Sequence, residues 1–339
     1  MRQISKLMAA TALSVAPVGL GEVGAVAADN DGDQVITIQV ENDLLFNTDE
    51  DYTNGLRIGL VHRPGKTPFA DDVSDLLRRY SPLADDAPSS DIYYSLALGQ
   101  NMYTPGDIAT SDLITDDRPY AGWLYLEFGV TRENPGGYEV AKLDLGVVGP
   151  ASLAGKTQRW WHGVIGIGKP EGWEHQLPNE PGINLYYSRG YRFATKAILG
   201  SLQADVTPHW GVALGNVHTY GAGGLTVRLG TNLNRDKGAP PRIQPSLPGS
   251  DHFSGDDDFD MYLFAGGEVR AVARNIFLDG TWRGHEHHVD KKTFLAEVQV
   301  GMVLFLGRTR FALTNAFRTS EFEGSGNHRY SALTMSLRF

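Results

Sequence analysis

Apolar residues alternate with small or polar ones along many short segments of the chain, and this period of two limits the folds it can adopt. From 34 to 44 the apolar residues are Ile36, Ile38 and Val40, whereas the positions between them are polar. Successive side chains of a strand point to opposite faces, so each such segment has one apolar and one polar face. Segments of about ten residues with this pattern are typical of strands in a lipid-exposed closed barrel.

Twelve segments show the alternation, and an even number suits an antiparallel barrel. They are 34–44, 52–62, 92–103, 120–131, 140–148, 183–195, 200–214, 219–231, 259–283, 292–305, 309–321 and 328–339. The last one runs to Phe339, an ending that resembles the terminal strand of bacterial outer-membrane barrels. We therefore predict an all-β fold, a 12-stranded antiparallel transmembrane β-barrel. A soluble secreted β-sandwich, which would also alternate, is the competing fold.

The first 27 residues have the pattern of a secretory signal peptide. Arg2 and Lys6 precede a largely apolar stretch, which ends in the small-x-small sequence at 25–27. Cleavage near Ala27 would leave 28–339 as a single barrel domain, and no later segment offers 18 consecutive apolar residues for a membrane helix. The predicted location is the outer membrane of a Gram-negative bacterium.

Composition excludes several classes of chemistry. The chain has no cysteine, so disulfides, thiolate metal sites and cysteine nucleophiles are excluded, and any metal must be bound by oxygen or imidazole. The net charge of -10 argues against a nucleic-acid partner, because phosphate binding needs a basic surface. No G-x-S-x-G motif is present, so the sequence gives no support for a serine hydrolase of the α/β type.

Three connections are too long to be turns. With both termini in the periplasm, 67–90 falls on the periplasmic side, where its helical spacing of apolar residues predicts an amphipathic helix that plugs or caps the barrel. The Pro- and Gly-rich segment 232–258 falls on the same side and is predicted to be irregular. The third outer loop, 149–182, is where we expect the function, with a short helix near the barrel mouth.

Two groups of residues could carry that chemistry. In the first hairpin, Asp43 and Thr53 are predicted to lie nearly opposite each other on the inward face of the outer rim, where they could share a ligand. Strict alternation then points Asn42 outward, toward lipid, so either the strand bulges there or the site straddles the barrel wall. In the outer loop, Gln158 and His162 are four residues apart, so a helix would place both on one face. His162 is therefore a candidate general base.

A further run, Gly-His-Glu-His-His at 284–288, contains three histidines that could bind a divalent cation. It lacks the H-E-x-x-H spacing and falls in a predicted hairpin loop, so an exposed loop is the favoured interpretation.

Seven short motifs, in order, carry a family resemblance. They are E-N-D at 41–43, D-Y-T-N-G at 51–55, Q-N-M-Y-T-P at 100–105, R-P-Y-A-G-W at 118–123, G-V-V-G-P at 146–150, Q-x-x-x-H at 158–162 and G-W-E-H-Q at 172–176. Together they resemble the outer-membrane lipid A 3'-O-deacylase family over essentially all of the mature chain. Each motif alone is weak, but seven in sequence are specific.

The resemblance implies a twelve-stranded barrel that uses calcium to hydrolyse the ester-linked 3'-acyloxyacyl chain of lipid A in the outer leaflet. It implies that His162 activates water beside Gln158, and that Asn42, Asp43 and Thr53 line the site. In one respect the sequence departs from the family: Gly168 stands where the family has an acidic residue, and the nearest carboxylates are Glu171 and Glu174. This departure bears on the calcium ligand set.

The mechanism that we expect from these residues needs no serine. A neutral imidazole at His162 would take a proton from water, while a divalent cation, calcium by the resemblance, held by Asp43 polarises the ester carbonyl. The partners would be lipid A, as part of lipopolysaccharide, and the outer-membrane lipids. The side chains predicted to bind the substrate, the basic ones through its phosphates, are Arg118, Lys156, Arg159, Lys169 and Trp173.

Two other functions remain open from the sequence. One is a barrel without catalysis, either a porin-like channel or a structural protein, which a wide charged interior would favour. The other is an outer-membrane phospholipase or esterase that acts through a Ser-His pair.

Overall fold

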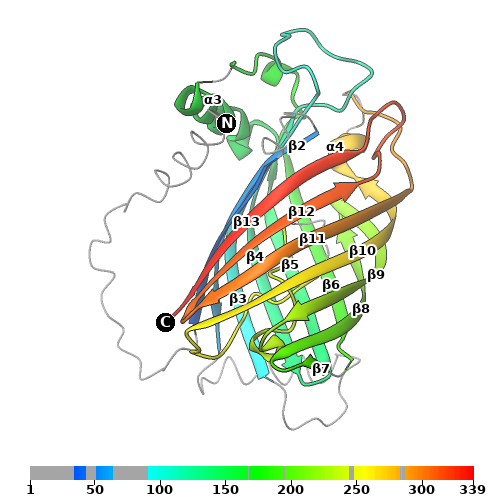
Figure 1. Cartoon of the computed structure of the whole chain (residues 1–339). Helices are drawn as coiled ribbons and strands as arrows, with labels where there is room; N and C mark the ends of the chain where they lie inside the picture. Colours follow the sequence, from blue (N-terminus) through cyan, green and yellow to red (C-terminus); the bar gives the residue numbers. More distant parts are fainter. Residues whose placement is uncertain are drawn as a thin grey trace, which may run out of the picture.

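The computed structural model of the chain describes residues 34–42, 51–63 and 91–339, except for 167, 194, 244–247, 283 and 285–286. At 51–53 and at 165 it describes the backbone alone. The predicted signal peptide and the predicted amphipathic helix at 67–90 lie outside the described residues. Figure 1 shows the described part as one strongly tilted sheet that curves into a barrel.

Thirteen strands form this sheet within the described residues. They are β1 (Gln34–Asn42), β2 (Asp51–His62), β3 (Asp91–Thr104), β4 (Ala121–Asn134), β5 (Gly137–Val148), β6 (Glu180–Tyr191), β7 (Lys196–Leu199), β8 (Leu202–Gly215), β9 (His218–Gly230), β10 (Phe259–Asn275), β11 (Phe294–Leu306), β12 (Thr309–Arg318) and β13 (His328–Arg338). The helical segments are η2 (Pro150–Ser152), α3 (Ala154–Ile165), η3 (Gly172–His175), η4 (Leu233–Arg235) and α4 (Ile276–Asp279). None of the helices in this part of the chain is long and apolar enough to span a bilayer.

The sheet closes on itself through one pairing between the first and last strands and one pairing that skips a single strand. β1 pairs with β13, and β6 pairs with β8 from Asn184↔Gly215 to Gly190↔His209. Beyond that point β7 takes over the pairing with β8, starting at Lys196↔Ala204. β6 and β7 therefore act as one interrupted strand of the wall. The predicted antiparallel barrel of twelve strands is confirmed, with β7 as a short extra strand that the sequence did not indicate.

One predicted strand was too long. The alternation had suggested 259–283, but β10 ends at Asn275 and the short helix α4 follows. The side chain of Asn275 accepts a hydrogen bond from Phe277 N at 3.2 Å, which caps the helix. The first three residues of α4, Ile276, Phe277 and Leu278, are apolar and buried, so their sequence alone resembles a continuing strand.

The two faces of the wall have the chemistry that the alternation predicted. In β3, Leu96 and Leu98 are about half exposed, whereas Ala97 between them is buried. In β4, Leu126 is exposed and Glu127 is buried. The apolar side chains point outward as a belt for hydrocarbon, and the small and polar ones fill the interior.

A long connection fills much of the lumen. Residues 232–243 and 248–258, which we call the lumen segment, leave the end of β9 and return to the start of β10. The predicted irregular backbone is found here, apart from the three residues of η4. We name the end of the barrel where this segment enters the inner end, and the end that carries α3 the outer end (Figure 1).

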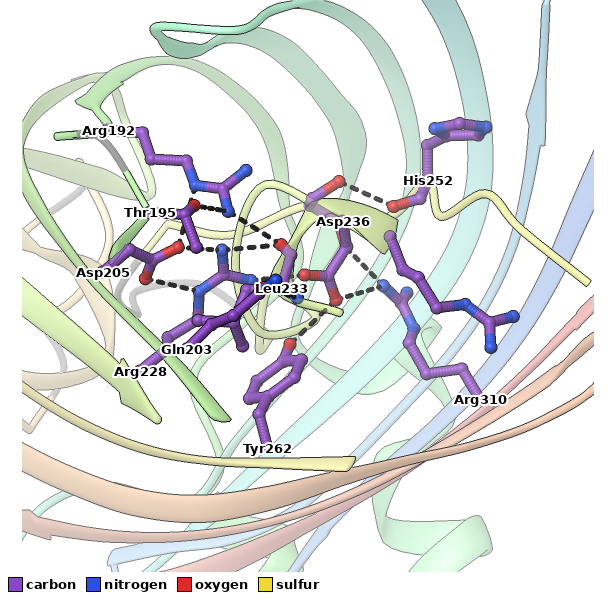
Figure 2. A network of polar contacts seen from close by, with 12 residues as sticks. Arg192, Thr195, Gln203, Asp205, Arg228, Leu233, Asp236, His252, Tyr262 and Arg310 are labelled. Carbon is purple, nitrogen blue, oxygen red and sulfur yellow. Dashed lines mark hydrogen bonds and ion pairs between the residues drawn. The ribbon is translucent and has the colours of Figure 1, made fainter. Parts of the chain in front are cut away.

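Buried charges fix the base of the lumen segment, as Figure 2 shows. Asp236 accepts hydrogen bonds from Arg228 Nη1 at 2.5 Å and from the Tyr262 hydroxyl at 2.8 Å. Arg310 Nη1 lies 3.6 Å from the same carboxylate and donates to the carbonyl oxygen of Ser250 at 3.0 Å. A buried charge is tolerated when it is paired and hydrogen-bonded, and this cluster meets both conditions.

Nearer the outer end, the lumen segment contacts strands from both halves of the chain. Arg242 donates to Glu297 Oε1 at 2.9 Å and to the Tyr330 hydroxyl at 2.7 Å. The backbone N–H of Ile243 donates to Glu41 Oε1 at 2.9 Å. A cavity of about 30 Å³ lies between this segment and the wall, which is room for a water molecule rather than for a conduction path.

The cluster around Asp236 generates a stability prediction. Asp236→Ala should lower the free energy of unfolding by about 3–5 kcal/mol, because Arg228 and Arg310 would lose a buried partner. Urea titration of the barrel refolded in detergent micelles measures this change.

Asp256→Ala is the matched control for this experiment. Asp256 lies in the same segment, but its ion pairs with Arg338 and Arg308 involve a largely exposed carboxylate, so the expected change is below about 1 kcal/mol. Equal midpoints for the two variants would contradict a structural role for the buried cluster.

Candidate functional site

The outer loop between β5 and β6 begins with a rigid turn against the barrel wall. Gly149 has φ +99°, in the region that favours glycine, and its N–H donates to the carbonyl of Gly122 at 2.9 Å. Ser152 Oγ donates to the carbonyl of Gly149 at 2.6 Å, and the Ser152 carbonyl accepts from Gln100 Nε2 at 2.6 Å. The start of α3 is therefore fixed to β3 and β4, before the helix leaves the wall.

This contact lies on the lipid-facing side of the wall. Gln100 and Gly122 have the same parity in their strands as the exposed Leu98 and Leu126, and the register between β3 and β4 is regular. A Cβ at Gly122 would come within 2.1 Å of Ser152 Oγ, so only glycine leaves room for the turn. The helix accordingly stands beside the outer end of the barrel and not inside its mouth (Figure 1).

The first hairpin presents residues to the same face at the same height. The register runs from Asn42 to Asn54, then to Met102 and to Gly122, across four neighbouring strands. Adjacent strands are about 4.8 Å apart, so Asn42 lies roughly 10 Å along the wall from Met102, which packs in the same apolar cluster as Ala154 of α3. The register of β1 is regular at Asn42, so the strand does not bulge there and Asn42 has the lipid-facing parity.

The remaining predicted residues of that hairpin are only partly described. Asp43 lies outside the described residues. At Thr53 the backbone is described, and the pairing of β2 with β3 shifts register between Tyr52 and Asn54. Thr53 therefore lies at a β-bulge or another irregularity of the pairing.

His162 lies on the buried face of α3 and is 1% exposed. Its Nδ1 is 2.6 Å from the carbonyl oxygen of Gly168. A carbonyl can only accept, so Nδ1 carries the proton and Nε2 carries the lone pair. Gly168 thus orients the imidazole through its backbone, although it has no side chain to do so.

Gln158 shares this buried face, as the spacing of four predicted, and it is 2% exposed. Trp173 Nε1 donates to Gln158 Oε1 at 2.6 Å. The indole N–H can only donate, so this bond fixes the orientation of the amide and turns Nε2 the other way. That Nε2 is buried and has no hydrogen-bond partner among the described residues. It is a donor available to a ligand.

Trp173, predicted to contact substrate, instead holds the loop together. It is buried, stacks at a tilt on Tyr120 with 5.1 Å between ring centroids, and packs over Gly155 of α3. Its neighbours Gln176 and Leu177 are tied back by backbone hydrogen bonds, the second to Tyr120. Any contribution of Trp173 to substrate binding would pass through Gln158.

The predicted phosphate-binding groups fall into two sets. Lys156, Arg159 and Lys169 are exposed on the outer loop. Arg118 is 1% exposed and donates to Glu321 Oε2 at 2.6 Å. Burial alone would raise the pKa of the Glu321 carboxyl, but the guanidinium groups of Arg118 and Arg318 hold that pKa well below its usual range. Arg118 belongs to an ion pair under the outer loops.

The described residues contain no cluster of three or more histidine and carboxylate side chains that could bind a metal. Glu171 and Glu174 are exposed on the loop surface, and the Glu174 carboxylate lies 3.8 Å from His175. In the histidine run, His287 Nε2 is 2.5 Å from the carbonyl of Asp117, which makes it a contact between loops.

Comparison with known proteins identifies the family. The family model described as outer membrane protein LpxR matches residues 7–339. The chain belongs to the LpxR family. This confirms the family that the seven ordered motifs predicted, and it makes the protein an outer-membrane barrel rather than a soluble sandwich. Among curated proteins, none matches this sequence.

Two solved structures are compared with this chain. LpxR from Salmonella typhimurium superposes with a TM-score of 0.73 at 22% identity, covering 90% of this chain and 100% of that chain. The β domain of the Bordetella autotransporter BrkA gives a TM-score of 0.44 at 12% identity, covering 91% of this chain and 99% of that chain. The first similarity shows that the LpxR-family barrel is the fold of this protein.

Residues of two LpxR-family motifs hold the outer loop in place against the wall. The sequence did not reveal this role. Gln100 opens the Q-N-M-Y-T-P motif and binds the Ser152 carbonyl, and Gly122 of A-G-W accommodates the Ser152 side chain. Their outward parity was visible from the alternation. Their partner was not, because the loop is about thirty residues away in sequence for Gly122 and fifty for Gln100.

The packing of α3 on Trp173 generates a prediction from a matched pair of glycines. Gly155→Ala should reduce protection of the α3 amides from hydrogen exchange, because its Cβ would lie 2.8 Å from the Trp173 ring. Gly163→Ala, with nothing within 4 Å, should increase protection, since alanine favours helix by about 1 kcal/mol over glycine. Mass spectrometry of exchanged peptides covering 154–166 compares them. Equal protection in the two variants would mean that Trp173 does not fix the helix.

Proposed function

We propose that this protein hydrolyses the ester that attaches the 3'-acyloxyacyl chain of lipid A in the outer leaflet. The observation that carries the proposal is the position of the polar face of α3. His162 and Gln158 are buried beside the lipid-facing side of the wall, at the end of the barrel where an outer-leaflet lipid would lie. An acyl chain can reach this side of the wall from the membrane without entering the lumen. Membership of the LpxR family supports the same reaction.

His162 would act as the general base. Its Nδ1–H is held by the Gly168 carbonyl, so Nε2 is the nitrogen that takes the proton from water. The water oxygen then attacks the ester carbonyl, and the ester C–O bond breaks to give a carboxylic acid and the free 3'-hydroxyl of the sugar. General-base catalysis contributes about 10²–10⁴-fold to such a reaction.

Gln158 would supply a hydrogen bond to the oxyanion that forms during the attack. Its Nε2 is a buried donor without a partner among the described residues, and Trp173 fixes the opposite end of the amide. A donor that is already oriented stabilises developing charge without reorganisation, and losing one such donor costs roughly 10²–10³-fold in rate. In this proposal Trp173 is a positioning residue.

Calcium is proposed as the cofactor, with Asp43 as its ligand and the oxygens of Asn42 and Thr53 nearby. This donor set is all oxygen, as calcium prefers, and it lies on the first hairpin rather than at Gly168, whose carbonyl is engaged by His162. A bound hard cation supplies charge that polarises the ester carbonyl. Lys156, Arg159 and Lys169 would receive the phosphates of the substrate.

The alternatives find less support in the described residues. A porin-like barrel needs an open lumen, whereas the lumen segment is tied to the wall by paired charges. A Ser-His esterase needs a serine beside the histidine, whereas Ser152 donates to the Gly149 carbonyl and holds the turn. Neither of these observations depends on Asp43.

Replacing the proposed base gives the direct test. His162→Ala should lower the rate of 3'-deacylation by about 10²–10⁴-fold, because no other group would take the proton from water. Mass spectrometry of lipid A from expressing cells, with and without the variant, measures loss of the 3'-linked acyloxyacyl unit.

His175→Ala is the matched control, since His175 is a histidine of the same loop that bonds the Ser111 carbonyl at the surface. It should leave the rate unchanged. Unmodified lipid A with the intact protein would reject the reaction, and equal rates in the two variants would reject the role of His162.

The calcium proposal has a separate test. A chelator should abolish deacylation by the intact protein, and added calcium should restore it, whereas Asp43→Ala should not recover with calcium in the same range. Purified protein in lipid vesicles allows the free calcium to be set. Full activity in the presence of chelator would remove the cofactor and leave water activation by His162 standing.

A further inference from the structure

The faces of α3 are not divided as expected for a helix on a protein surface in water. The buried face carries the polar side chains of Gln158 and His162. The exposed face carries Trp160, which is 62% exposed, and Val164, which is 54% exposed. A surface helix normally buries its apolar stripe and exposes its polar one. The exposed face therefore fits a medium that is not bulk water.

The location of the helix indicates which medium this is. α3 begins on the lipid-facing side of β3 and β4, directly above the apolar belt that contains Leu98 and Leu126. Trp160 and Val164 are exposed on this helix, so in a bilayer they would meet the outer edge of the belt, where hydrocarbon gives way to headgroups. Tryptophan is enriched in membrane proteins at this boundary.

The charges of the helix agree with an anionic surface. Lys156 and Arg159 are its only charged residues and both are exposed, although the whole protein has a net charge of -10. Long basic side chains beside an apolar face can extend to phosphates while their methylene groups lie along the apolar surface. Basic and aromatic residues on one exposed helix face are typical of helices that lie in a membrane interface.

We propose that α3 is an interfacial anchor, whose exposed face is embedded in the outer leaflet. Trp160 and Val164 enter the boundary of the acyl chains, and Lys156 and Arg159 reach the phosphate layer. The occupant of this face is the membrane that surrounds the barrel, not a second protein. The anchor would hold the buried face at the depth of the headgroups, and it goes beyond the proposed hydrolysis because it needs only the wall register and the faces of the helix.

The absence of cysteine from the chain allows a clean test. Val164→Cys is labelled with a nitroxide, and the full-length protein is reconstituted in vesicles of phosphatidylethanolamine and phosphatidylglycerol. Collisions of the label with oxygen, which concentrates in lipid, are compared with collisions with a water-soluble nickel complex. Leu126→Cys is the lipid reference, and Gly326→Cys, in an open position between β12 and β13, is the aqueous reference.

The label at 164 should gain oxygen collisions and lose nickel collisions, as at 126 and in contrast to 326. Nickel collisions at 164 equal to those at 326 would overturn the proposal. Protection from both reagents would also overturn it, because it would indicate a protein contact at this face. The readout involves no catalysis, so a failed anchor and a failed hydrolysis are distinguishable.

Discussion

In a closed sheet that crosses a membrane, every backbone polar group must be paired within the sheet, so each wall residue is committed to one of two environments. A side chain faces either hydrocarbon or the lumen, and a shift of one residue would exchange all of them. Here the pairing of β1 with β13 and of β6 with β8 completes that ladder. The position of the outer loop follows from it, since Gln100 and Gly122 can reach the loop only on the lipid side.

The division of side chains between lipid and lumen also explains the composition of the barrel interior. Inward positions of the strands carry many buried charged residues, and buried charges must be neutralised locally. The lumen segment supplies part of that neutralisation, with Asp236 toward the inner end and Arg242 toward the outer end. The wall and its filling are therefore one electrostatic unit, and the interior is taken up by structure. In the proposed function, the chemistry on a membrane substrate therefore takes place on the outer surface of the wall.

Much of the fold could be predicted from the sequence, because alternation records directly which face of a strand meets lipid. The helix containing Gln158 and His162 was predictable as well, since residues four apart in a helix share a face. The side of the wall on which that helix lies was not predictable, because it depends on a long-range contact between Ser152 and Gly122. The ion pair of Arg118 with Glu321 was hidden for the same reason, as 203 residues separate the partners. The outward parity of Asn42, by contrast, was visible from the alternation, and the regular register of β1 agrees with it.

The missing side chain at Gly122 has a mechanical consequence. Ser152 and Ala154 rest directly on this residue, and a Cβ there would come within 2.1 and 2.4 Å of their side chains. From Ala154 to His162 the helix rises about 12 Å. A small tilt of the helix at its contact with Gly122 therefore becomes a larger displacement at His162. A methyl group at position 122 would tilt the helix. The tilt would move the imidazole of His162, which lies at the far end of the helix from the contact. The space that Gly122 leaves open thus determines where the imidazole of His162 lies, two helical turns away.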